Sequence, residues 1–342
     1  LDDLLAGHAG LPLGTSLLIE EQGTTDFAGA LLRYYAAEGL VQGHQVHVLG
    51  FAEGWKTELP GLAAERSGSK AEKLPSPSED KMKIAWRYEA LGHRGAPDVP
   101  PNRPEGGDTG AVFRHSFDLT KRLAQSAMKG ALHAAPSSDP FNLSFEAKDS
   151  PSPFRAFLRL LHSQLASSSP ETIHRVVVPS LLSPAFYTGG ACHPAEVLQF
   201  LHALRALLRR HSTRLTALIT LPVSLYPRNT GLTRWMEILS DGVLELIPLH
   251  TNPIAAMPKG SSDKSSSKDA EKAQGLLKVH SMPIYHEKGG GGAEGNYFRE
   301  NLSFSLSSSR GLVIKPYSLP PMEGDEHKEK SPASTAKDGI EF

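Results

Sequence analysis

The sequence predicts an α/β fold in which a mostly parallel β-sheet is flanked by helices. Two observations carry this prediction. Short apolar segments of strand length alternate with longer segments whose apolar residues recur at helical spacing. In addition, the first elements follow the order strand, glycine turn, helix, strand, which is the βαβ unit of parallel sheets. Segments at the C-terminal end read as antiparallel strands that close one edge of the sheet.

The first βαβ unit lies at the start of the chain. The apolar run Thr15–Glu20 follows a turn rich in glycine and proline, and it predicts a buried strand. Phe27–Gly39 predicts a helix because its apolar residues recur every three to four positions. Gln45–Phe51 follows the turn at Gly43 and predicts the second strand.

The same alternation continues along the rest of the chain. Pro194 opens one of the expected helices, since proline suits the first helical turn. The expected elements are a helix over 154–165, a strand over Arg175–Val178, a helix over Pro194–Leu208, a strand over Leu215–Leu221, a helix over Leu232–Leu239, and antiparallel strands over Gly275–Ile284 and Asn301–Ile314.

Segments rich in Ser, Pro, Gly, Lys and Glu interrupt this pattern. Such segments bury too little apolar surface to offset the entropy lost on ordering, so we predict long disordered insertions. They lie near 64–82, 94–110, 133–153, 258–275 and 286–295. The sequence therefore predicts one domain over 1–318, followed by a disordered tail over 319–342.

Composition excludes several classes of function. The 36 basic and 37 acidic side chains leave no global charge that would attract nucleic acid or a membrane surface. The single cysteine, Cys192, excludes an internal disulfide and fits a reducing compartment. The apolar run Leu215–Leu225 is interrupted by Pro222 and is shorter than the roughly 18 residues of a membrane helix, so we expect a soluble protein. Because the chain opens at Leu1 within a turn-and-helix signal, we expect that its natural N-terminus is missing.

The loop after the first strand lies where P-loop proteins bind phosphate. Their motif is Gly-x-x-x-x-Gly-Lys-Ser/Thr, in which amides cradle the phosphates and the lysine neutralises them. With Gly23 placed on the inner glycine of such loops, the two motif glycines become Glu20 and Thr25. The lysine becomes Asp26 and the hydroxyl residue becomes Phe27. Unit charges about 5 Å apart interact by roughly 3 kcal/mol at an effective dielectric of about 20, so this inversion predicts that triphosphate is repelled.

A second requirement of P-loop ATPases is also unmet. A carboxylate at the end of a later strand should hold magnesium, but Val178 is followed by Pro179 and Ser180, and Leu221 is followed by Pro222. We therefore predict degenerate Walker A and Walker B motifs, no catalytic residue, no cofactor and no metal. The loop alone is equally compatible with an ordinary strand–helix connection that has no ATPase ancestry.

Several sequence segments resemble the PAXNEB family, the family of the fourth Elongator subunit. They are Leu1–Gly7, Pro12–Gly14, Leu18–Glu21, Ala37–Leu40, Lys83–Glu89 and His115–Leu119. The resemblance runs from Leu1 to about Tyr317, and Ile84–Glu89 is its most specific part. It implies a RecA-like fold and assembly with the fifth and sixth Elongator subunits into a hetero-hexameric ring.

The resemblance also implies a role in RNA processing. The ring attaches to the larger Elongator subcomplex, whose third subunit catalyses wobble-uridine modification of tRNA, and it helps to bind and release tRNA. The protein would then be an accessory subunit of the cytoplasm and nucleus. Two alternatives remain open: an ATP-hydrolysing ring motor, and a pure assembly scaffold without RNA contact. The resemblance does not decide whether the assembled ring hydrolyses ATP.

A tRNA-binding ring needs cations, and the sequence offers a local excess of arginine. Loops after the central strands of RecA-like rings face the channel, which favours Tyr226, Arg228 and Arg234 after the 215–221 strand as RNA contacts. The other candidate RNA contacts are Arg209, Arg210 and Arg214. The alternative for Arg205 and Arg209 is a solvated helix face.

Other polar residues have weaker assignments. Candidate ring-interface residues are Lys83, Trp86, Arg87 and Glu89, although such a tryptophan often belongs to the core. Asp118 is expected to cap a helix rather than bind metal. His44 and His47 should point to opposite faces of a strand, and Cys192 beside His193 is a poor catalytic pair.

Overall fold

The protein is described by a computed structural model that covers residues 10–63, 114–137, 152–249, 273–283, 302–307 and 311–317. The insertions predicted near 64–82, 94–110 and 286–295 lie outside these ranges, as do the 319–342 tail and most of the other two insertions. The candidate interface residues Lys83, Trp86, Arg87 and Glu89 lie outside them too. The domain boundaries and the ring-interface residues stay predictions.

A nine-stranded sheet forms the centre of the molecule, with strand order β11-β10-β9-β8-β1-β7-β6-β2-β5. Strands β8 through β5 in this order run parallel, and β9, β10 and β11 add to β8 in antiparallel fashion. The strands are β1 (Ser16–Glu21), β2 (Gln45–Leu49), β5 (Ala131–Ala135), β6 (His174–Val178), β7 (Leu215–Pro222), β8 (Gly242–Pro248), β9 (Gly275–Ser281), β10 (Leu302–Ser307) and β11 (Gly311–Pro316). The predicted fold class is confirmed.

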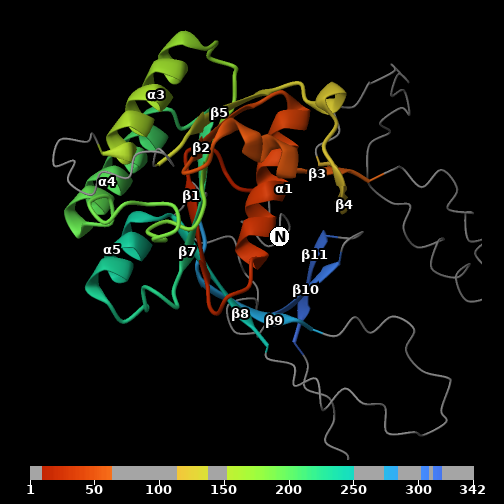
Figure 1. Ribbon diagram of the computed structural model, residues 1–342, viewed down its shortest axis with the longest axis vertical. Helices are drawn as coiled ribbons and strands as arrows, with labels where there is room; N and C mark the ends of the chain where they lie inside the picture. Colours follow the sequence, from red (N-terminus) through yellow and green to blue (C-terminus); the bar gives the residue numbers. More distant parts are fainter. Residues whose placement is uncertain are drawn as a thin grey trace, which may run out of the picture.

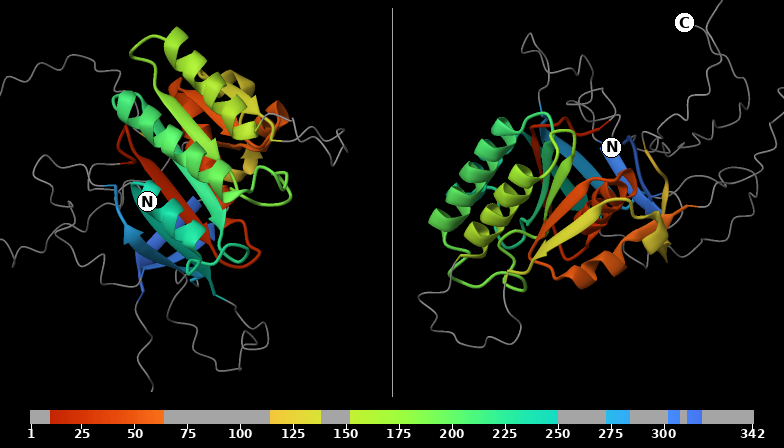
Figure 2. Two further views of the ribbon diagram at one scale, coloured as in Figure 1. Left: turned by 90° about the vertical axis from the view of Figure 1, so that its left-hand side faces the viewer. Right: turned by 90° about the horizontal axis from the view of Figure 1, so that it is seen from above.

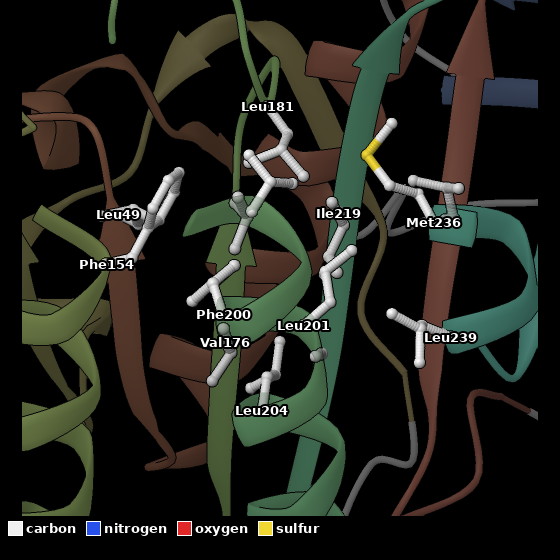
Figure 3. Close-up of a cluster of buried hydrophobic side chains, with 14 of the residues drawn as sticks. Leu49, Phe154, Val176, Leu181, Phe200, Leu201, Leu204, Ile219, Met236 and Leu239 are labelled. Atoms are coloured by element: carbon white, nitrogen blue, oxygen red, sulfur yellow. The ribbon is translucent and has the colours of Figure 1, made fainter. Parts of the chain in front are cut away.

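Helices cover both faces of this sheet (Figures 1 and 2). Helices α3 (Pro153–Ser167), α4 (Pro194–Arg210) and α5 (Gly231–Leu239) lie on one face, and α1 (Phe27–Gln42) lies on the other. Each helix buries an apolar stripe against the strands, so the domain has two core layers. Figure 3 shows the first layer, where Phe200 and Leu204 of α4 meet Val176 and Ile219 of the sheet. Among the described helices, none is long and apolar enough to span a bilayer.

Three local expectations were wrong or incomplete. Residues 133–135 belong to β5 rather than to a loop, because they pair with the otherwise open edge of β2. Asp118 caps no helix: it lies in β4 (Phe117–Arg122), which pairs with β3 (Pro60–Leu62) beside short 3-10 turns at 53–58 and 125–127. Its carboxylate instead accepts from the backbone N–H and the hydroxyl of Thr120. Strand β8, which lies beside β1, was not identified from the sequence.

Candidate functional site at the end of strand β1

The predicted phosphate loop lies between the end of β1 and the start of α1. Strand β1 is central, with β7 on one side and β8 on the other, so its carboxyl end opens at the middle of the sheet. Gly23 adopts a φ of 81°, a conformation that favours glycine, and its N–H donates to Ser224 Oγ at 2.7 Å. The loop is therefore tied to the segment that follows β7.

The carboxylate of Glu21 binds the N-terminus of α1. Its Oε1 accepts from the Thr25 hydroxyl at 2.7 Å and from the Phe27 N–H at 2.9 Å, while its Oε2 accepts from the Ala28 N–H at 3.0 Å. The side chain is almost buried, and that burial raises the pKa of Glu21 despite these hydrogen bonds. Free N–H groups at a helix N-terminus are the donors that P-loop proteins offer to phosphate. An anion from the chain itself already occupies them here.

Asp26 stands at the position of the P-loop lysine. Its carboxylate forms an ion pair with Arg33 Nη2 at 2.9 Å and remains 66% exposed. It makes no capping bond to α1, since Glu21 takes those donors. The Asp26 side chain also lies against Gly29, where any Cβ would fall 1.9 Å from its Oδ1. A Cβ at residue 29 would therefore push the exposed Asp26 carboxylate aside.

Glu20 enters a separate, mostly buried group of charges. Arg228 Nε lies 2.9 Å from Glu20 Oε2 and 2.8 Å from Glu237 Oε1. Arg228 Nη1 is 3.7 Å from Glu245, which also contacts His280 Nε2 at 2.7 Å and accepts a hydrogen bond from Gln22 Nε2. Burial and the nearby Glu237 raise the pKa of Glu20 to about 8, more than the arginine can offset. The hydrogen bond from His280 holds the pKa of Glu245 below its usual value. This group links β1, α5, β8 and β9 at one end of the sheet.

The candidate RNA contacts fall at two ends of strand β7. At its carboxyl end, the Tyr226 hydroxyl donates to the Leu182 carbonyl. Arg228 forms an ion pair with the buried Glu20, and Arg234 pairs with Glu237 at 2.8 Å. The remaining candidates lie at its amino end. Their contact with RNA stays a prediction.

The candidates at the amino end of β7 differ in their hydrogen bonds, their ion pairs and their exposure to solvent. Arg214 donates to the carbonyls of Leu165 and Ser169 and so closes the C-terminus of α3. Arg209 pairs with Asp241 at 2.6 Å but stays 56% exposed. Arg210, the last residue of α4, is exposed.

Three histidines stack across neighbouring strands, a grouping that the sequence analysis did not predict. His47 of β2 lies between His133 of β5 and His174 of β6, with ring centroids 4.9 and 5.2 Å apart. His47 Nε2 is 2.9 Å from His174 Nδ1, and His174 Nε2 is 2.8 Å from Ser168 Oγ. Burial lowers the pKa of His174 to about 4 and that of His47 well below its usual value. Both shifts favour the neutral imidazole, and His47 and His174 are buried in the core, whereas His133 is half-buried.

The remaining candidate pairs do not meet. His44 accepts from Arg175 Nε at 3.0 Å, away from His47. The Cys192 thiol contacts the Leu182 carbonyl at 3.6 Å, and burial raises its pKa, which opposes a reactive thiolate. In the described ranges, no three or more His, Cys, Asp or Glu side chains are arranged to hold a metal ion.

Comparison with known proteins gives a consistent family. The PAXNEB protein family model matches residues 1–342. Elongator complex protein 4 of Schizosaccharomyces pombe is 30% identical over 95% of this chain and 84% of its own length. The Homo sapiens protein of that name is 30% identical over 72% of this chain, and the Saccharomyces cerevisiae one is 24% identical over 84%. These alignments span 61% and 66% of those two proteins' lengths.

Among solved structures, a DnaB-like replicative helicase matches with a TM-score of 0.42 and 12% identity, over 90% of this chain and 60% of that chain. The family assignment rests on the sequence matches. The family model matches the whole chain, and the relatives from two yeasts and human match 72–95% of it. The chain belongs to the PAXNEB family.

Proposed function

We propose that this protein is a non-catalytic, RecA-like accessory subunit of the Elongator complex in the cytoplasm and nucleus. It joins the fifth and sixth Elongator subunits in a hetero-hexameric ring, which binds tRNA and supports wobble-uridine modification by the larger subcomplex with the catalytic third subunit. The names of its relatives support the Elongator assignment. The absence of catalysis is supported chiefly by one observation, the Glu21 carboxylate bound to the N-terminus of α1.

Phosphate binding at this loop faces two obstacles. A nucleotide would have to displace Glu21 from Thr25, Phe27 and Ala28, because these groups can serve only one anion at a time. It would also have to approach Asp26, which carries the wrong sign of charge. Both effects act against triphosphate, so the Walker A position is degenerate in charge as well as in sequence.

The isolated chain is expected to show no magnesium-dependent binding of ATP at micromolar concentration. Titration with a fluorescently labelled ATP analogue, with and without magnesium, measures this directly. Binding with a micromolar Kd that disappears on chelating magnesium would favour the alternative of a ring motor. ATP bound only by the assembled ring would point to its partner subunits.

The exposed cations are the better candidates for RNA. Arg209, Arg210 and Arg234 reach solvent, whereas Arg228 already neutralises buried carboxylates. Removing Arg228 would take away the cation that pairs with the buried Glu20, so a loss of RNA binding there would be hard to separate from misfolding. We therefore rank the α4 end, Arg209 and Arg210, and the exposed Arg234 before Arg228, Arg214 and Tyr226.

Reversing the charge at Arg210 is expected to weaken tRNA binding by the assembled ring several-fold. Each lost phosphate contact should also reduce the slope of log K against log salt by about 1. Binding is measured by filter retention or anisotropy at several salt concentrations for Arg210→Glu. The control is Lys121→Glu, an exposed cation on β4.

These variants also separate the proposal from a pure scaffold. If the ring assembles and Arg210→Glu changes neither the tRNA affinity nor its salt slope relative to the control, Arg210 does not contact RNA. If the assembled wild-type ring shows no salt-dependent tRNA binding at all, the scaffold alternative stands.

A further inference from the structure

Large exposed hydrophobic side chains gather in one short segment. Among the described residues, the three are Leu225 at 54%, Trp235 at 53% and Ile238 at 63% exposure. Trp235 and Ile238 are three positions apart on α5, so they lie on the same side of that helix. Leu225 lies in the loop that leads from β7 to α5. A tryptophan half open to water is costly in a monomer and is typical of a binding surface.

The fold does not need this face of α5. The opposite side of the helix buries Thr233, Met236 and Leu239, and Figure 3 shows Met236 and Leu239 pointing toward the sheet. Thr230 caps the N-terminus of α5 by accepting from the Thr233 N–H. The buried side of α5 therefore holds the helix against the sheet, and the fold does not depend on the exposed side that carries Trp235 and Ile238.

The surroundings of this face are positively charged. Arg234 and Arg209 are 61% and 56% exposed, and Arg205 donates to the Ile238 carbonyl. The nearby carboxylates are largely covered: Glu237 is 10% exposed and Asp241 is 8% exposed. The cations therefore meet solvent while their partners lie beneath them. An approaching molecule meets apolar side chains rimmed by arginine.

We propose that the outer face of α5, centred on Trp235 and Ile238, docks a neighbouring ring subunit whose contact surface combines apolar side chains with carboxylates. This inference rests on the proposed function, because the partner is taken to be the fifth or sixth Elongator subunit. Tryptophan and arginine are the residues enriched among interface hot spots. A second copy of this chain is disfavoured, since the same face would set arginine against arginine. RNA would use the tryptophan for stacking but gains little from Leu225 and Ile238.

The experiment reconstitutes the ring from the full chain and the fifth and sixth subunits. Trp235→Ala is expected to weaken assembly at least about 10-fold, as for a hot-spot residue, and Ile238→Ala by less. Trp235→Glu should weaken assembly more than Trp235→Arg, because the partner is expected to be acidic. Thermal melts of the isolated variants should match the wild type, since both side chains are exposed. His202→Ala, an exposed residue on α4, is the matched control.

The possible results separate this inference from the proposed function. If the wild-type chain does not join the other two subunits, the ring proposal fails and the docking surface with it. If the wild type assembles and the Trp235 variants assemble with equal affinity, only the docking surface is overturned. It is equally overturned if the variants form the ring normally but lose tRNA binding. The same holds if the isolated wild-type chain self-associates and the Trp235 variants do not.

Discussion

Lowering the pH from about 6.5 to about 5 should cost the folded protein about 2 kcal/mol of stability through His174 alone. His174 is fully buried, and burial, followed by the Arg214 charge, lowers its pKa from 6.5 to about 4. In the unfolded chain the imidazole takes up a proton near pH 6.5, whereas in the folded protein it stays neutral until about pH 4. The unfolded state binds more protons in this window. Stability is therefore complete above the window and is lost as the pH falls through it.

Other titratable groups also make the stability depend on pH, some in the same direction as His174 and one in the opposite direction. His47 and His133 share the row and also have lowered pKa values, and burial lowers that of His44 to about 4. Glu20 works against them: its pKa is raised from 4.5 to about 8, so its contribution improves as the pH falls across that range. The total slope is a sum of both signs. The histidine part must be measured as a difference between variants.

His174→Asn provides that difference. The asparagine side chain retains a polar atom where Nδ1 contacts His47, but it does not titrate. Urea unfolding at about pH 7.5 should show the variant to be less stable, because Ser168 loses its shortest hydrogen bond, the one to His174. Between about pH 6.5 and 5, the variant should lose about 2 kcal/mol less than the wild type. His202→Asn, on the exposed surface of α4, serves as control. Parallel pH profiles for His174→Asn and the wild type would contradict the prediction.

The histidine row shows where sequence reasoning reaches its limit. The order of local elements was readable, because apolar runs such as Leu215–Leu221 and the glycine turn at Gly43 are local signals. The adjacency of His47, His133 and His174 depends on the strand order β5-β2-β6, which no local pattern fixes. The sequence also predicted a loop over 133–153, which would have left His133 outside the sheet.

The positions of the charged residues could be predicted from the sequence, but their contacts could not. The loop position and the missing lysine were visible in the sequence, and both agree with the location of Glu20 and Asp26. The role of Glu21 was not, because its bonds to Phe27 and Ala28 depend on how the chain folds back after Gly23. Arg228 looked like a free cation for a similar reason. Its partner Glu20 is some two hundred positions earlier, and only the packing of β1 beside β7 brings them together.

Removing the Glu21 carboxylate should destabilise the protein and uncover a phosphate site. Glu21→Ala deletes the acceptor for two first-turn N–H groups of α1 and for the Thr25 hydroxyl. Losing such a charged cap costs about 2 kcal/mol, which chemical denaturation at neutral pH measures. Thr25→Val removes one of the three bonds and should cost about 1 kcal/mol. Glu21→Gln should fall between them, because one amide oxygen still accepts while the NH₂ group cannot.

The uncovered donors should then respond to added anion. With a Kd of about 10 mM, phosphate at about 50 mM would restore about 1 kcal/mol to Glu21→Ala, whereas chloride at equal ionic strength would not. The wild type and Thr25→Val should not respond, since Glu21 still fills the site. Equal stabilisation of all three proteins would mean that phosphate binds elsewhere and that Glu21 is only a structural cap.

The adjacent charge sets how far this conversion can go. Asp26 remains beside the loop in Glu21→Ala, so that variant should still fail to bind ATP at micromolar concentration. Adding Asp26→Lys replaces the repelling charge with an attracting one and should tighten phosphate binding at least about tenfold over Glu21→Ala. If the double variant binds phosphate no better than the single one, the charge at residue 26 does not reach the N-terminus of α1. The loss of phosphate binding would then rest on Glu21 alone.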